Sequence, residues 1–273
     1  MQKVGINTNC GCGANYFEIC DNIKKSGIES IMIALIPNME KEQFEYAKKL
    51  GLNVSFVHLD NTETDEMWVR GNAHNDQLEL YKKQIALCAE YGVKIAVLHA
   101  TKGRTCAAVV EPTEFALDEY KSLVEFAKSK KVKIALENLD NGGFKHFKFL
   151  LDNIKSPYFG FCYDFGHHNL YNKDKDLIGL YGDRLLAVHL HSNLGDYELG
   201  MDYSRDLHML PFDGTVDYNK VVKQLKAVGY KNTIMIETNK NPKGDPKIYK
   251  DLTNLQFLEK AKAVMLKLRD MMK

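Results

Sequence analysis

The sequence has no long hydrophobic run and no excess of charge of either sign. No stretch approaches the roughly 18 consecutive apolar residues that a membrane-spanning helix needs, and the first residues lack the apolar segment of a secretory signal. Lysine and arginine total 37 and aspartate and glutamate total 36, a net charge of +1. This balance gives no bulk attraction to nucleic acid or to an anionic membrane surface. We therefore expect a cytoplasmic protein with no membrane partner.

Several local motifs are missing as well. No G-x-G-x-x-G follows the first predicted strand, so the glycines at positions 11 and 13 are interpreted as a turn and not as a phosphate-binding loop. The six cysteines are scattered through the chain, which favours reduced thiols over a disulfide framework. Cys10 and Cys12 are separated by one residue, and two thiols at that spacing are weak evidence for a soft-metal site.

No linker, charge block or low-complexity segment divides the 273 residues, so we expect one domain that spans residues 1–273. What recurs is a short apolar run followed by a polar loop and a segment with helical periodicity. The short length and the β-branched and aromatic content of these runs suit strands of a parallel sheet that is buried on both faces. The eight runs are residues 4–6, 30–36, 54–59, 95–99, 134–137, 159–164, 185–191 and 233–237.

The segments between the runs are predicted to be helices. Residues 41–50 and 76–91 carry apolar residues at steps of three and four, and Thr113 opens a further helix over 113–130. Glycines at positions 51, 92 and 229 follow the ends of three helices, where a left-handed cap favours glycine. Eight repeats of strand and helix predict a single closed (β/α)8 barrel, the TIM barrel of the α/β class. A doubly wound open sheet is the alternative.

Residues that bind divalent metals stand at the ends of the last six predicted strands. Barrel enzymes place their active sites at the carboxyl ends of the strands, so these side chains are expected to meet at one mouth of the barrel. Crowded carboxylates and imidazoles would be costly there without a cation to neutralise them, so we interpret the set as a metal site. The six residues are His58, His99, Glu137, Asp164, His191 and Glu237.

Three further candidates lie outside the strands. His167 follows Asp164 by three residues, and the turn after the sixth strand would return it to the site. Asp206 and His208 belong to the connection after the seventh strand, which is longer than a typical loop and therefore suggests a function. His189 has the inward phase, but it is interpreted as a core or supporting position one layer below the ligands.

Four short segments carry a family resemblance: Ile-Ala-Leu-Glu137-Asn138, Asp164-Phe-Gly-His167, His189-Leu-His191 and Ile-Glu237-Thr. With these segments the sequence resembles the xylose-isomerase-like barrel superfamily, which contains sugar isomerases and epimerases together with the endonuclease IV class of DNA-repair enzymes. The resemblance implies that the shared metal ligands are Glu137, Asp164, His191 and Glu237. The residues that match the additional ligands of the trinuclear zinc site in the nuclease branch are His58, His99, His167, Asp206 and His208.

The resemblance implies a divalent metal (manganese, magnesium, cobalt or zinc) and favours an isomerase or epimerase of a small carbohydrate or sugar phosphate. In that reaction the metal polarises a carbonyl and stabilises an enediolate, while Glu137 and Glu237 act as acid and base. Arg205 and His167 would bind hydroxyl groups or an oxyanion. With a single metal, the other additional residues would contact the substrate instead of a metal: His58, His99, Asp206 and His208. Trp68, the only tryptophan, would stack on the apolar face of a sugar, with packing beneath a loop as the alternative.

Two other functions stay open at this point. The full set of nine ligand types favours a zinc phosphodiesterase that acts at abasic sites in DNA, but the acidic segment at residues 60–66 suits a phosphate backbone poorly. Basic residues such as Lys102 and Lys145 are interpreted as ordinary solvated loop charge. The third possibility is a metal-stabilised barrel that binds a small ligand without turnover. The sequence leaves the number of metals and the oligomeric state open.

Overall fold

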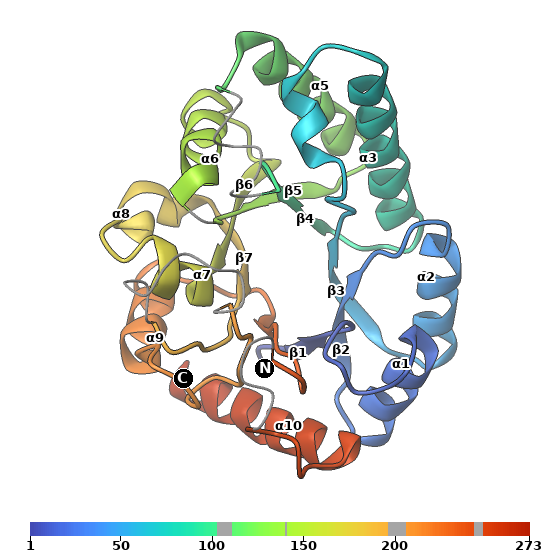
Figure 1. The fold of residues 1–273 in the computed structure, drawn as a ribbon, viewed down its shortest axis with the longest axis vertical. Helices are drawn as coiled ribbons and strands as arrows, with labels where there is room; N and C mark the ends of the chain where they lie inside the picture. The colour runs from blue at the N-terminus through green and yellow to red at the C-terminus, as the bar shows by residue number, and fades with distance from the viewer. Residues whose placement is uncertain (103–110, 140, 196–205, 243–247) are drawn as a thin grey trace.

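The fold is an eight-stranded parallel barrel (Figure 1). The computed structural model describes residues 1–102, 111–139, 141–195, 206–242 and 248–273. The strands are hydrogen-bonded in the order β7-β6-β5-β4-β3-β2-β1-β8, and every pairing is parallel. The strands are β1 (Val4–Asn7), β2 (Ser30–Ala34), β3 (Asn53–His58), β4 (Ile95–His99), β5 (Lys133–Glu137), β6 (Phe159–Asp164), β7 (Leu185–His189) and β8 (Ile234–Ile236).

The sheet closes through one residue just beyond β7. The Leu190 N–H donates to the Met235 carbonyl at 2.9 Å, and the Glu237 N–H donates to the Leu190 carbonyl at 3.2 Å. These two bonds form a parallel bridge between Leu190 and Ile236 and join the two ends of the strand order. The prediction of one closed (β/α)8 barrel is therefore confirmed.

Helices surround the barrel on its outer face (Figure 1). The helices predicted over residues 41–50, 76–91 and 113–130 are confirmed to within a few residues at each end. The helices are α1 (Tyr16–Lys25), α2 (Glu40–Lys49), α3 (Asn72–Glu90), α5 (Glu114–Ser129), α6 (Asn141–Asn153), α7 (Phe165–Tyr171), α8 (Leu177–Tyr181), α9 (Tyr218–Ala227) and α10 (Asn254–Met271), with 3-10 turns η1 (Thr64–Trp68) and η2 (Gly182–Arg184). Within the described part of the chain, none of the helices combines the length and hydrophobicity that crossing a bilayer requires.

Local sequence signals explain where several helices begin and end. The Thr113 hydroxyl accepts the Ala116 N–H at 3.2 Å and caps α5, because the first N–H groups of a helix have no partner inside it. Gly51 and Gly92 adopt φ values of 66° and 76° immediately after the caps of α2 and α3. Glycine carries no Cβ to oppose this left-handed conformation, so both positions stop their helices at low cost.

The inside of the barrel is apolar up to the level of the strand ends. The larger hydrophobic cluster lies between strands and helices, and a second cluster fills the barrel interior. Its members are Met32, Phe56, Ile95, Val97, Ala135, Cys162, Ala187 and Met235. Because side chains alternate along a strand, Ala135, Cys162 and Ala187 each place the residue two positions later on the same inward face. Those later residues are Glu137, Asp164 and His189, which form the first polar layer above the apolar interior.

Candidate metal centre

Most of the predicted site residues meet at the carboxyl-terminal mouth of the barrel. They surround a pocket of about 270 Å³. Asn9, Ala34, Lys102 and Leu139 complete its described lining. The predicted residues that line it are His58, His99, Glu137, His167, Asp206, His208 and Glu237.

Four buried residues form what we call the core group: Glu137, Asp164, His189 and Glu237. One potential ligand atom from each lies within 4.8 Å of the others. The His189 Nδ1 atom is 2.9 Å from Glu237 Oε2, 3.2 Å from Glu137 Oε2 and 3.8 Å from Asp164 Oδ2. No member is more than 8% exposed. Three of the four expected shared ligands, Glu137, Asp164 and Glu237, are thus brought together, and the histidine grouped with them is His189.

The expected shared ligand His191 meets only one of the three carboxylates, because its Nε2 atom lies 3.0 Å from Asp164 Oδ1. The reason is where β7 ends. The apolar run suggested a strand that continues to His191, but β7 stops at His189. Leu190 then closes the barrel against β8, so His191 stands two residues above the core group, on the same face of the chain. His189, which was expected to support the ligands from one layer below, is therefore the residue that meets all three carboxylates.

A second set, the paired-histidine group, consists of His58, His99 and Glu137. The two Nε2 atoms are 3.1 Å apart, and they lie 3.2 Å and 3.3 Å from Glu137 Oε2. Two imidazole nitrogens at this separation cannot both carry a hydrogen. They share one proton or present lone pairs to a cation. Glu137 belongs to this group and to the core group, so one carboxylate would bridge two adjacent cation positions.

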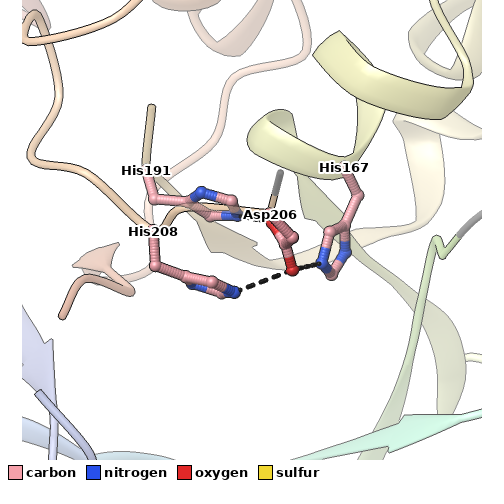
Figure 2. A group of neighbouring side chains, drawn as sticks. All are labelled: His167, His191, Asp206 and His208. Atoms are coloured by element: carbon pink, nitrogen blue, oxygen red, sulfur yellow. Dashed lines mark hydrogen bonds and ion pairs between the residues drawn. The ribbon is translucent and has the colours of Figure 1, made fainter. Parts of the chain in front are cut away.

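The third set, the outer group, consists of His167, His191, Asp206 and His208 (Figure 2). Asp206 Oδ2 lies 3.1 Å from His167 Nε2 and 3.0 Å from His208 Nε2. His191 Nε2 is 3.8 Å from Asp206 Oδ1, and its ring stacks on the His208 ring with centroids 4.0 Å apart. His167 comes from the first turn of α7, whereas Asp206 and His208 come from the connection between β7 and α9.

The orientation of three histidine rings fits metal coordination. In each of them Nδ1 faces a backbone carbonyl oxygen to which it can donate, and Nε2 is the ring nitrogen turned toward the site. Such a hydrogen bond is the usual way that a metal-binding histidine is held in one tautomer. The carbonyl oxygens and distances are Leu59 at 3.1 Å for His58, Asn138 at 3.0 Å for His167, and Glu237 at 3.0 Å for His208.

Buried polar atoms without a hydrogen bond also indicate that these residues suit a metal ion. Within the described residues, both ring nitrogens of His189, Nδ1 of His191 and Oδ1 of Asp206 make no hydrogen bond. Buried polar groups normally find partners, so several orphaned atoms in one place call for an explanation. The close approaches of His189 Nδ1 to carboxylate oxygens, without hydrogen-bond geometry, suit ligands that converge on a common cation. The donor set therefore fits a divalent metal.

The electrostatics favour ionised carboxylates. Burial raises the pKa of Glu137, but the surrounding histidines, first His189 and His99, outweigh burial and hold that pKa well below its usual range. The pKa of Glu237 is lowered for the same reason. Conversely, burial lowers the pKa of His208, yet Asp206 outweighs it and the pKa rises to about 10. Without a cation, protons on the histidines therefore balance the carboxylates.

Neighbouring residues fix the ligands in place. The Asn138 amide donates to the Asp164 carbonyl at 3.0 Å and accepts the Asp164 N–H at 2.8 Å, which clamps the ends of β5 and β6 together. Asp164 also caps α7, because its carboxylate accepts the His167 N–H at 2.6 Å. A Cβ on Gly166 would lie 2.0 Å from the His191 ring, so only glycine fits there. Asn138 directly follows Glu137, and no pattern in the sequence predicted this clamp.

The cysteines near the barrel mouth and at the N-terminal end do not add metal ligands to the site. Cys162 lies close to Glu137 and His189, but burial raises the pKa of its thiol to about 12, so the thiol stays protonated at neutral pH. Cys10 and Cys12 are buried free thiols, and no group of potential ligands among the described residues includes either.

Trp68, one of the two expected substrate-binding residues, does not line the pocket. Trp68 is only 3% exposed, and its Nε1–H donates to the Ala100 carbonyl at 2.6 Å. Its ring packs against Tyr120 of α5 and His146 of α6, so the tryptophan belongs to the core and does not offer its face to a sugar. Arg205 lies outside the described residues.

A model of the xylose isomerase-like TIM barrel family matches residues 11–260. The chain belongs to this family. Among curated proteins, uncharacterized protein y4fM of Sinorhizobium fredii (strain NGR234) is 28% identical over 203 residues, which cover 71% of this chain. The match covers 60% of the relative, so this xylose isomerase-like chain corresponds to only part of that protein's length.

Solved structures of other proteins superpose along nearly the whole chain. A D-tagatose 3-epimerase-like protein has a TM-score of 0.71 at 19% identity, with 99% of this chain and 98% of that chain covered. The IOLI protein with a bound zinc atom has a TM-score of 0.71 at 18% identity, with 97% of each chain covered. At these identities the likeness establishes the shared fold.

Proposed function

We propose that this chain is a divalent-metal-dependent isomerase or epimerase of a small sugar or sugar phosphate. The observation that carries the proposal is the core group: two glutamates, an aspartate and a histidine within 4.8 Å of one another beside a pocket at the barrel mouth. The metal would be manganese, magnesium, cobalt or zinc, which carboxylate and imidazole ligands accommodate. An epimerase-like protein and a zinc-bound protein among the structural neighbours support this proposal.

The chemistry follows from the two glutamates. A divalent cation held by the core group would act as a Lewis acid on the carbonyl of an open-chain sugar. Glu137 ends β5 and Glu237 follows β8, three positions apart around the ring, so the two carboxylates approach the pocket from different sides. One ionised carboxylate takes the proton from the carbon next to the carbonyl. Return of a proton to the former carbonyl carbon isomerises the sugar. Return of a proton to the original carbon, from the other glutamate on the opposite face, epimerises it.

The pocket suits a small substrate. Its volume of about 270 Å³ lies just below the ~300–1,000 Å³ range of pockets for drug-sized ligands. Glu137 is 2% exposed and Glu237 is 8% exposed, so little water reaches the two carboxylates. Exclusion of water protects a reactive enediolate and strengthens the electrostatic interactions that stabilise it.

Replacement of Glu237 by glutamine tests the role of the glutamate pair. Wild-type protein, purified without chelator, is incubated in D2O with a panel of ketoses and ketose phosphates, and deuterium uptake next to the carbonyl is followed by NMR. We expect uptake with at least one sugar, and a loss of about 100-fold or more in Glu237→Gln when both proteins are compared at a metal concentration that saturates the variant. Glu111→Gln, a change at an exposed carboxylate away from the pocket, is the control. Unchanged exchange in Glu237→Gln would disprove the acid–base role.

A multinuclear zinc hydrolase of phosphodiesters, similar to endonuclease IV, is the second candidate. The paired-histidine and outer groups favour it, because a one-metal isomerase does not require them as ligands. Against it, the acidic residues of the segment that leads into η1 lie beside the mouth, and Glu63 pairs with the pocket residue Lys102. Cleavage of an abasic-site duplex at physiological salt, with about three zinc ions per chain and no exchange in any sugar, would replace the first proposal by this one.

A further inference from the structure

We propose that Lys102 selects an anionic substrate, so that the pocket takes a phosphorylated sugar in preference to the free sugar. This inference rests on the proposed function and specifies the substrate class of the same site. Among the described residues that line the pocket, Lys102 is the one whose side chain is cationic at neutral pH whether or not a metal is bound. The histidines there face the potential cation positions instead.

Lys102 is well placed to hold the far end of a substrate. It follows β4, which lies four positions from β8 in either direction around the closed ring. Lys102 and Glu237 therefore approach the pocket from opposite sides of the mouth. A sugar whose reacting carbons lie between Glu137 and Glu237 would direct its remaining carbons, and a terminal phosphate, across the pocket toward Lys102.

A buried carboxylate fixes the backbone at this lysine. The Lys102 N–H donates to Asp65 Oδ1 at 2.7 Å, and Asp65, in η1, is only 7% exposed. The backbone position is thus held by a charge-assisted hydrogen bond beneath the surface, while the side chain extends to the pocket. An ordinary solvated loop lysine would not need such an anchor.

The ion pair between Lys102 and Glu63 is easily exchanged. Lys102 Nζ lies 2.9 Å from Glu63 Oε2, and the two side chains are 35% and 57% exposed. The hydrogen bond with Glu63 raises the pKa of Lys102, so the ammonium group stays protonated. Ion pairs this exposed are weak, because water screens them and both side chains lose freedom. A phosphate brings up to two charges and three acceptor oxygens, so it can displace Glu63.

Calorimetric titration of inorganic phosphate into metal-loaded protein tests the anion site without turnover. We expect Lys102→Met to weaken phosphate binding about 10-fold or more, and Lys102→Arg to retain it to within a few-fold. Glu63→Gln removes the competing carboxylate, so binding should tighten about 2- to 5-fold. The matched control is Lys145→Met: Lys145 is 36% exposed and paired with Glu111, but it does not line the pocket. Equal phosphate affinity in wild type and Lys102→Met would overturn the inference.

Kinetics on matched sugars separate this inference from the proposed function. Lys102→Met should raise KM for a ketose phosphate about 10- to 100-fold and leave KM for the corresponding free ketose within about 3-fold. If both substrates lose activity equally, Lys102 only supports the fold and the inference is wrong. If wild-type protein acts on ketoses but shows no preference for the phosphate, the inference fails and the proposed function stands. If it exchanges no sugar at all, the proposed function fails, and the phosphate titration alone decides the role of Lys102.

Discussion

The core group and the outer group differ in what holds their ligands. Three core ligands end strands β5, β6 and β7, the fourth directly follows β8, and all four are buried. The outer group takes Asp206 and His208 from the connection between β7 and α9, and its His208 adopts a strained φ of 46°. The hydrogen-bond register of the barrel therefore fixes the core group, whereas the outer group depends on a loop. We expect the core group to bind metal more tightly and to carry the chemistry.

Removal of the metal should have the largest effect. Dialysis against a strong chelator should abolish sugar turnover, and re-addition of manganese, magnesium, cobalt or zinc should restore it. The metal-free protein should also unfold about 5–12 °C lower, because a tightly bound ion stabilises the folded state by mass action. Thermal unfolding followed by circular dichroism measures this shift. Full activity with less than about 0.1 metal ion per chain would contradict the metal-dependent mechanism.

The second prediction distinguishes the two histidines of β7 and its extension. His189→Asn should lower the affinity of the core metal about 100-fold, because it removes a ligand from a set fixed by the barrel. His191→Asn should leave the core metal in place. The half-buried His168, which belongs to none of the ligand groups among the described residues, provides the control His168→Asn. Metal content after dialysis, measured by elemental analysis, decides the point, and the opposite ranking would return His191 to the core set.

Asp206→Asn should have a smaller effect, confined to the outer group. Asp206 lies within about 3 Å of His167 and His208 and holds both through its Oδ2 atom. We expect the variant to keep its core metal and to raise KM about 3- to 10-fold with little change in kcat, because the outer group shapes the pocket wall. A loss of kcat as large as that of Glu237→Gln would show that both groups take part in the chemical step.

Much of this arrangement could be predicted from the sequence, and the exceptions have physical causes. The eight strands and the inward face above Ala135 and Cys162 followed from hydrophobic runs and two-residue alternation. The same alternation places His189 and His191 on one face, so it cannot choose between them. Only the bridge at Leu190, a contact with β8 far away in the chain, places His189 against all three carboxylates and His191 against Asp164 alone.

Other features depend on distances that no local pattern contains. The division of the nine candidate ligands into three groups, two of which share Glu137, is a property of the closed barrel. Trp68 was open to two interpretations, and the burial of its ring in the core selects packing. The sequence indicated only an ordinary loop charge at Lys102. The hydrogen bond from its backbone N–H to Asp65 and its place in the pocket lining locate it at the mouth of the barrel.

The smallest predicted effect is a release of protons when metal binds. In the metal-free protein the pKa of His208 is raised to about 10 by Asp206 against the effect of burial, so at pH 7 this histidine is protonated. Its pairing with Asp206 stabilises the folded protein fully below its unfolded pKa of about 6.5, and this stabilisation is lost as the pH rises through about 10. A cation must displace such protons, so we expect about one to three to be released per chain at pH 7.

Calorimetric metal titrations in buffers of different ionisation enthalpy measure this number. In Asp206→Asn the pKa of His208 should fall toward its ordinary value, because the main carboxylate that raises it is gone. The release should then decrease by up to about one proton, while binding at the core group continues. An unchanged release in Asp206→Asn would mean that the outer histidines carry no exchangeable proton. The difference between the two groups would then lie in their backbone support alone.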